Sequence, residues 1–303
     1  MERRFDRTAE DLGNIVALEH VNVTVPDQQQ ATVFYIAGLG LTRDPFLMTG
    51  PTNMWVNVGR SQFHLPTGSA QVLRGHTGIV VPNREALVRR LERTRKRLEG
   101  TRFDFREREE FVEATCPWGN RIRCYAPDQQ RFGRITLGIV YVEFDVPKGA
   151  ADRVARFYRN VMGARAAASG EGGGRVAKDD NGTSRAARVE VGIGRYLIFR
   201  ETDHEIPPYD GHHIQIYVAD FSGPYAKLLD RGLISEESDQ HQYRFKDLVD
   251  PETGETLFTI EHEVRSMRHP LFMRPLVNRN PSQSNINYAP GCDAWIPGMT
   301  PQD

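Results

Sequence analysis

The chain has 303 residues, of which 39% are hydrophobic and 26% charged, and this length suits about two globular domains with buried cores. Thirty-nine basic and 40 acidic side chains leave a formal net charge of −1, so we expect neither nucleic acid nor an anionic membrane as a partner. The apolar stretches are strand-sized, the N-terminus lacks a signal-peptide core, and the three cysteines form no CxxC motif. These features predict a cytoplasmic protein with free thiols.

A repeated pattern organises the chain. An alternating segment at 20–26 precedes a helix-like segment with Phe34-Tyr35, and the same order recurs at 140–147 with Phe157-Tyr158. Two shorter units open at His76 and His213. Alternating segments separated by turn signals follow each helix, so every unit is predicted to be β-α-β-β-β. The units span about 14–68, 72–128, 135–202 and 210–264.

The domain organisation follows from these units. We predict an N-terminal arm at 1–13, a first pair of units at 14–130, a second pair at 135–264, and an irregular C-terminal tail at 265–303 that packs on the body. The tail could equally reach a second subunit, so a homodimer stays open. The sequence also allows unit one to pair with unit four instead of unit two.

The four units, the Phe-Tyr…Leu-Gly ending of the first helix and the Asp250-Pro…Gly254 turn before a final strand resemble the vicinal oxygen chelate superfamily. This group includes glyoxalase, extradiol dioxygenases and bleomycin-resistance proteins. The resemblance implies an α+β fold of four βαβββ modules that form two open, barrel-like half-domains, with a divalent metal inside a barrel. In that family the ligands come from the first and last strands of the units, and the corresponding positions here are His20, His76, Tyr141 and His213 in the first strands and His64, Arg123, Phe199 and Phe258 in the last strands.

Strand alternation gives the direction of these side chains. His20 shares a strand face with Asn22, and Gln62 shares one with His64. We predict His20, His64 and His76 as metal ligands in the first pair of units. If unit one instead pairs with unit four, His213 is the alternative third ligand. Neutral imidazoles suit several divalent metals, so iron, zinc, nickel and manganese all stay open.

The remaining predicted site residues concern the substrate. Arg123 stands where the family usually has a metal-binding glutamate, and a guanidinium cannot bind a cation but favours an anionic ligand. We therefore predict Arg123, Asn22 and Gln62 as substrate-binding residues, and Tyr125 as an acid or hydrogen-bond donor. Glu261 would need a strand bulge to point inward.

These residues favour a metal-dependent enzyme that acts on a small, anionic, oxygen-chelating acid or enol, by dioxygenase, lyase or isomerase chemistry. The alternative is a metal-free protein of the bleomycin-resistance type, which binds or sequesters a small molecule. His212 should point away from its neighbour His213, so we expect it at the surface.

Overall fold

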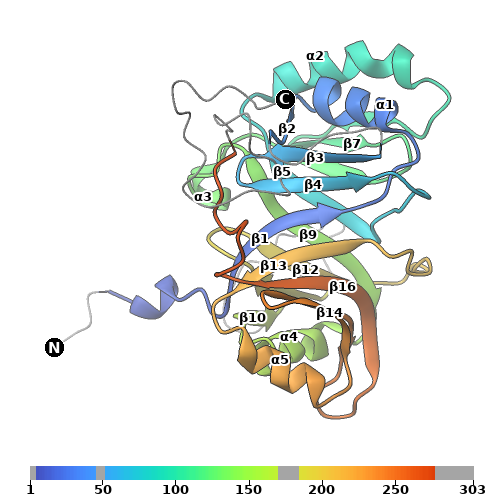
Figure 1. The fold of residues 1–303 in the computed structure, drawn as a ribbon. Helices are drawn as coiled ribbons and strands as arrows, with labels where there is room; N and C mark the ends of the chain where they lie inside the picture. Colours follow the sequence, from blue (N-terminus) through green and yellow to red (C-terminus); the bar gives the residue numbers. More distant parts are fainter. Residues whose placement is uncertain (1–4, 46–51, 170–183, 277–303) are drawn as a thin grey trace, which may run out of the picture.

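The computed structural model describes residues 5–45, 52–169 and 184–276. The described strands form two eight-stranded mixed sheets, one in front of the other in Figure 1, with helices α1 and α2 at one end of the molecule and α4 and α5 at the other. The predicted α+β fold of four βαβββ units in two open half-domains is confirmed.

The elements follow the predicted order of the units. A 3-10 turn at Arg7–Glu10 precedes unit one, which contains β1 (Ile15–Asn22), α1 (Gln28–Ala31) with a π-helical turn (Thr32–Gly38), β2 (Thr42–Arg43), β3 (Asn53–Val58) and β4 (Ser61–Pro66). Unit two contains β5 (Gly75–Val80), α2 (Arg84–Thr94) with a 3-10 turn (Arg95–Leu98), β6 (Asp104–Glu107), β7 (Phe111–Thr115) and β8 (Arg121–Tyr125).

After the short helix α3 (Gln129–Phe132), unit three contains β9 (Gly138–Pro147), α4 (Ala151–Asn160), β10 (Ala166–Ala168), β11 (Ala186–Glu190) and β12 (Tyr196–Thr202). Unit four contains β13 (His213–Val218), α5 (Ser222–Leu229), β14 (Ile234–Asp239), β15 (Gln242–Val249) and β16 (Thr256–Ser266). None of the helices in the described ranges is long and apolar enough to cross a membrane.

The pairing of the units decides where the site forms. The sheet orders are β14-β15-β16-β13-β1-β4-β3-β2 and β10-β11-β12-β9-β5-β8-β7-β6. Unit one therefore shares a sheet with unit four through the antiparallel pair β1–β13, and unit two shares one with unit three through β5–β9. The segment 14–130 is divided between the two sheets, and the second of the two pairings that the sequence allowed is the one present.

The described part of the tail packs on the body, beside β1 and β4 (Figure 1). We call residues 267–276 the strap. The Phe272 ring lies 4.8 Å from the Tyr217 ring, between centroids. The Arg274 side chain is 2% exposed, and its Nη2 lies 2.6 Å from Oδ2 of the fully buried Asp44. The predicted tail beyond residue 276, with Cys292, lies outside the described residues.

Candidate metal centre

Polar side chains gather on one face of four adjacent strands, β4, β1, β13 and β16. Directly paired residues of neighbouring strands project to the same face. His20 is opposite Gln62 on one side and Gln215 on the other. His213 is opposite Asn22 and Glu261. Pairing of units one and four thus brings His20 and His213 onto one surface.

Three side chains on this surface could hold a metal ion. His20, His213 and Glu263 each offer one ligand atom, and the three atoms lie within 4.8 Å of one another. The residues are only 1%, 8% and 3% exposed. Within the described chain, neither Nε2 of His20 nor Nε2 of His213 has a hydrogen-bond partner. A buried imidazole nitrogen without a partner carries a desolvation cost that a bound ion would remove.

Two further carboxylates lie behind the histidines. Glu19 Oε2 is 3.3 Å from His20 Nδ1, and Glu261 Oε1 is 3.7 Å from His213 Nδ1. A carboxylate on that side favours a proton on Nδ1, which leaves the Nε2 lone pair free for a metal. Consecutive residues of a regular strand point to opposite faces, and a register shift in β1 between Leu18 and His20 lets Glu19 approach its neighbour.

The protonation states suit ligation. Burial holds the pKa of His20 well below its usual value, and the nearby Arg265 and Arg244 add to the effect. Burial also lowers the pKa of His213 far below the ordinary range, with His20 and Arg244 as further causes. Both imidazoles are therefore neutral near pH 7, which is the form that binds metals.

Two arginines hold the carboxylate of the third candidate ligand. Glu263 Oε2 accepts from Arg244 Nη2 at 2.5 Å, and Glu263 Oε1 forms an ion pair with Arg265 Nη2 at 2.6 Å. Burial nevertheless raises the pKa of Glu263, because the loss of water outweighs the two cations. The carboxylate is fixed in place beside the two histidines.

His64, a predicted ligand, borders this centre but has both ring nitrogens engaged. Its ring centroid lies 5.8 Å from that of His20 and stacks at 3.7 Å on Trp55. Its Nδ1 accepts from the Asn22 side chain at 2.6 Å, and its Nε2 donates to Asn53 Oδ1 at 3.0 Å. The predicted substrate residue Asn22 therefore orients His64.

The structure does not bring the other predicted residues of unit two to His20. His76 is on β5, in the second sheet, where its Nε2 lies 3.0 Å from Tyr141 Oη. Tyr125 Oη also bonds Tyr141 Oη, at 2.8 Å. Arg123 pairs with Glu113 at 3.2 Å. The physical reason is the edge-to-edge pairing: β5 hydrogen-bonds to β9 instead of β1.

His212 and Gln62 both form hydrogen bonds with buried or neighbouring polar side chains. His212 is fully buried, with Nδ1 at 2.5 Å from Asp210 Oδ1, so the expected surface position is wrong. A hydrogen bond to a side chain of its own loop offsets part of the free-energy cost of burying the imidazole. Gln62, predicted to bind substrate, donates through Nε2 to Asp44 Oδ2 and Asn57 Oδ1, at 2.6 Å each.

Sequence reasoning missed Glu263 and placed Glu261 outside the site unless a bulge were present. That bulge exists: Phe245 pairs with His262, whereas Asp247 pairs with Thr259, so β16 has one more residue than β15 between these points. The extra residue changes which side chains face inward. The sequence did offer one signal for Glu263. Because side chains alternate along a strand, Glu263 shares a face with Arg265 when positions are counted backwards from the end of β16.

No protein-family model and no curated protein sequence matches the chain. Solved structures do match. A "putative dioxygenase" from Bacillus subtilis is 16% identical over 91% of this chain and 90% of that chain, with a TM-score of 0.54. Glyoxalase I from Zea mays is 13% identical over 82% of this chain and 92% of that chain, with a TM-score of 0.56. The chain therefore has the fold of the vicinal oxygen chelate superfamily, as the sequence predicted.

Proposed function

We propose that this protein is a metal-dependent enzyme that acts on a small, anionic, oxygen-chelating acid or enol. The observation that carries the proposal is the buried group of His20, His213 and Glu263, in which the Nε2 atoms of the two histidines have no hydrogen-bond partner among the described residues. Two imidazoles and one carboxylate form the donor set typical of non-haem iron(II) oxygenases, so iron suits the site best. When bound, a divalent metal would supply Lewis acidity toward two substrate oxygens, and iron would add dioxygen chemistry.

The chain's own residues would prepare this chemistry. Glu19 bonds Nδ1 of His20 and Glu261 lies beside Nδ1 of His213, which favours a proton on Nδ1 and a free lone pair on Nε2 in both histidines. Arg244 and Arg265 fix the Glu263 carboxylate and also pair with Glu261 and Glu19. The charge of a bound divalent metal would favour an anionic substrate over a neutral one.

Metal content tests the proposal. Protein purified without chelator should contain close to one equivalent of a transition metal, and His20→Ala, His213→Ala and Glu263→Gln should each lower that content at least tenfold, because each removes one ligand. His76→Ala is the matched control, since this buried histidine lies in the other sheet, and it should leave the content unchanged. Elemental analysis measures all four variants. Full occupancy in the first three would exclude this centre.

One observation favours the metal-free alternative, a protein that binds a small molecule without transforming it. Arg244 and Arg265 already neutralise the carboxylate of Glu263, so this side chain has counter-charges without an ion. Under this alternative, less than about a tenth of an equivalent of any transition metal would be present, with no uptake on addition.

A further inference from the structure

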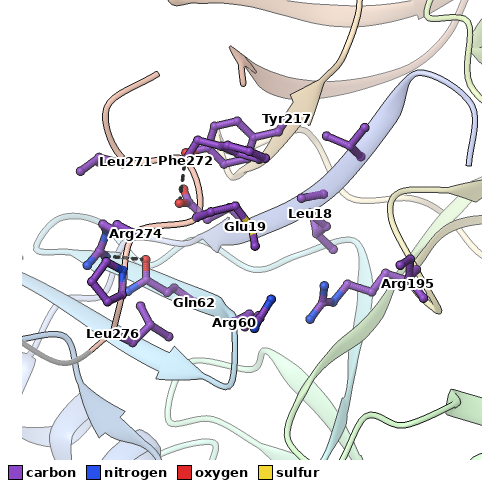
Figure 2. A pocket seen from close by; sticks show the side chains of 15 residues that line it. Leu18, Glu19, Arg60, Gln62, Arg195, Tyr217, Leu271, Phe272, Arg274 and Leu276 are labelled. Atoms are coloured by element: carbon purple, nitrogen blue, oxygen red, sulfur yellow. Dashed lines mark hydrogen bonds between the residues drawn. The ribbon is translucent and has the colours of Figure 1, made fainter. Parts of the chain in front are cut away.

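A cavity of about 500 Å³ lies between β1, the strap and two hairpin turns (Figure 2). Most of its lining is apolar and includes Leu18, Leu271 and Phe272. Three arginines also line it, Arg60, Arg195 and Arg274, and Figure 2 shows the Arg195 side chain extending toward Arg60. None of the three candidate metal ligands lines this cavity.

Arg60 and Arg195 come from equivalent turns of the two sheets. Arg60 follows Gly59 in the turn between β3 and β4, and Arg195 follows Gly194 in the turn between β11 and β12, which also contains Gly192. Gly59 packs against the backbone just before β9, and Gly192 packs against the backbone of β1. A Cβ on Gly59 would lie 2.1 Å from Leu137 O, and one on Gly192 would lie 2.8 Å from Val16 O. This close approach places both turns, and with them Arg60 and Arg195, at the junction of the two sheets.

Arg60 lies close enough to Arg195 for the two positive charges to interact. Among the residues that the structure describes, neither Arg60 nor Arg195 forms an ion pair, and Arg195 Nε donates to the backbone oxygen of Ile139 at 3.1 Å. Burial lowers the pKa of Arg195, and the charge of Arg60 adds to the effect. Opposed guanidinium groups repel each other, so an anion between them would be stabilised by both.

The other charged groups of this cavity already have partners. Arg274 is paired with Asp44. The carboxylate of Glu19 lies 3.0 Å from Arg265 Nη1 and 3.3 Å from His20 Nδ1. The unneutralised charge of the lining therefore belongs to Arg60 and Arg195.

We propose that this cavity binds a small amphipathic anion, with its carboxylate between Arg60 and Arg195 and its apolar body against Leu18 and Phe272. Guanidinium groups bind carboxylates through two parallel hydrogen bonds, and the apolar walls suit the hydrocarbon part of the ligand. This site adjoins the candidate metal centre at Glu19 but contains none of its three candidate ligands, and it needs no metal.

Titration calorimetry with octanoate tests the proposal, with octanol as the neutral ligand of the same chain length. Octanoate should bind more tightly than octanol, and 0.5 M NaCl should weaken octanoate alone. Arg60→Gln and Arg195→Gln should each weaken octanoate about tenfold, the loss expected for one charge-assisted bond, and leave octanol unchanged. Arg89→Gln, on the exposed face of α2, is the control.

Equal affinity for octanoate and octanol, or octanoate affinity unchanged in both pocket variants, would overturn the proposal. Arg60 is exposed, so Arg60→Gln should fold. If Arg195→Gln is unstable, the octanoate affinity of Arg60→Gln alone tests the proposed site. Metal content, measured on the same samples, should stay at the wild-type level. A failure of the metal proposal is therefore visible separately from a failure of this one.

Discussion

His76 shows how burial sets the charge of a single residue. Its side chain is enclosed in the second sheet, with Nε2 at 3.0 Å from Tyr141 Oη. Burial holds its pKa well below the ordinary value of 6.5, and the positive charges of Arg123 and Arg121 act in the same direction. The folded protein therefore keeps His76 neutral, whereas the unfolded chain takes up a proton as the pH falls below 6.5.

This difference predicts a loss of stability in acid. The contribution of a neutral His76 is fully present above pH 6.5 and declines as the pH falls toward the folded-state pKa, by up to about 1.4 kcal/mol per pH unit. We expect the free energy of unfolding to fall less steeply between pH 6.5 and 5.5 in His76→Gln than in the wild type. Urea titrations of both proteins with chelator present measure this. Parallel curves would contradict the assignment.

Strand alternation correctly predicted the sheet face to which individual side chains project. His20, Asn22, Gln62 and His64 project to one face of the sheet, as expected. Alternation does not reveal hydrogen-bond partners, however, and these determine roles. His64 has both ring nitrogens occupied, whereas His20 keeps Nε2 without a partner in the described chain.

At the scale of an element, the strap depends on one buried ion pair. Arg274 and Asp44 are 2% and 0% exposed, and Gln62 Oε1 accepts from Arg274 Nη2 at 3.2 Å. Removing one partner of a buried pair leaves an uncompensated charge, which costs about 3–5 kcal/mol. Release of the strap into water would avoid this cost.

Asp44→Asn should therefore detach the strap before the whole protein unfolds. We expect trypsin to cleave after Arg268 at least tenfold faster in this variant, because local opening exposes the backbone. Mass spectrometry of the fragments measures the rates. Asp104→Asn removes a carboxylate from an exposed pair with Arg106 and should leave cleavage unchanged. Equal rates in all three proteins would show that the ion pair does not hold the strap.

At the scale of the whole molecule, glycines permit the close contact of the two sheets. Gly59 has a φ of +65°, and a Cβ there would lie 2.1 Å from Leu137 O. Gly232 has nearly the same φ, +66°, but nothing lies within 4 Å of its Cβ position. A side chain at either position would therefore suffer the same backbone strain, but only one at Gly59 would also collide with neighbouring atoms.

The Gly59→Ala and Gly232→Ala pair separates these effects. Both variants place an alanine at a positive φ, which strains the backbone, but Gly59→Ala must also displace the backbone near Leu137. We expect its free energy of unfolding to be lower than that of Gly232→Ala by about 1–3 kcal/mol, the usual cost of overpacking. Chemical denaturation of both variants measures the difference. Equal destabilisation would mean that the sheets adjust freely at this junction.

The sequence by itself determined the class of fold, the four units and the face of each first strand, because these depend on local periodicity. Tertiary structure decided which units share a sheet. The alternating pattern of β1 could fit β5 or β13 equally well, and hydrogen bonds between strands almost 200 residues apart make the choice. That choice replaced His76 by His213, and the bulge in β16 brought Glu263 beside it. Long-range pairing and strand irregularity leave no local periodic signal, so the candidate centre could be recognised only in the folded chain.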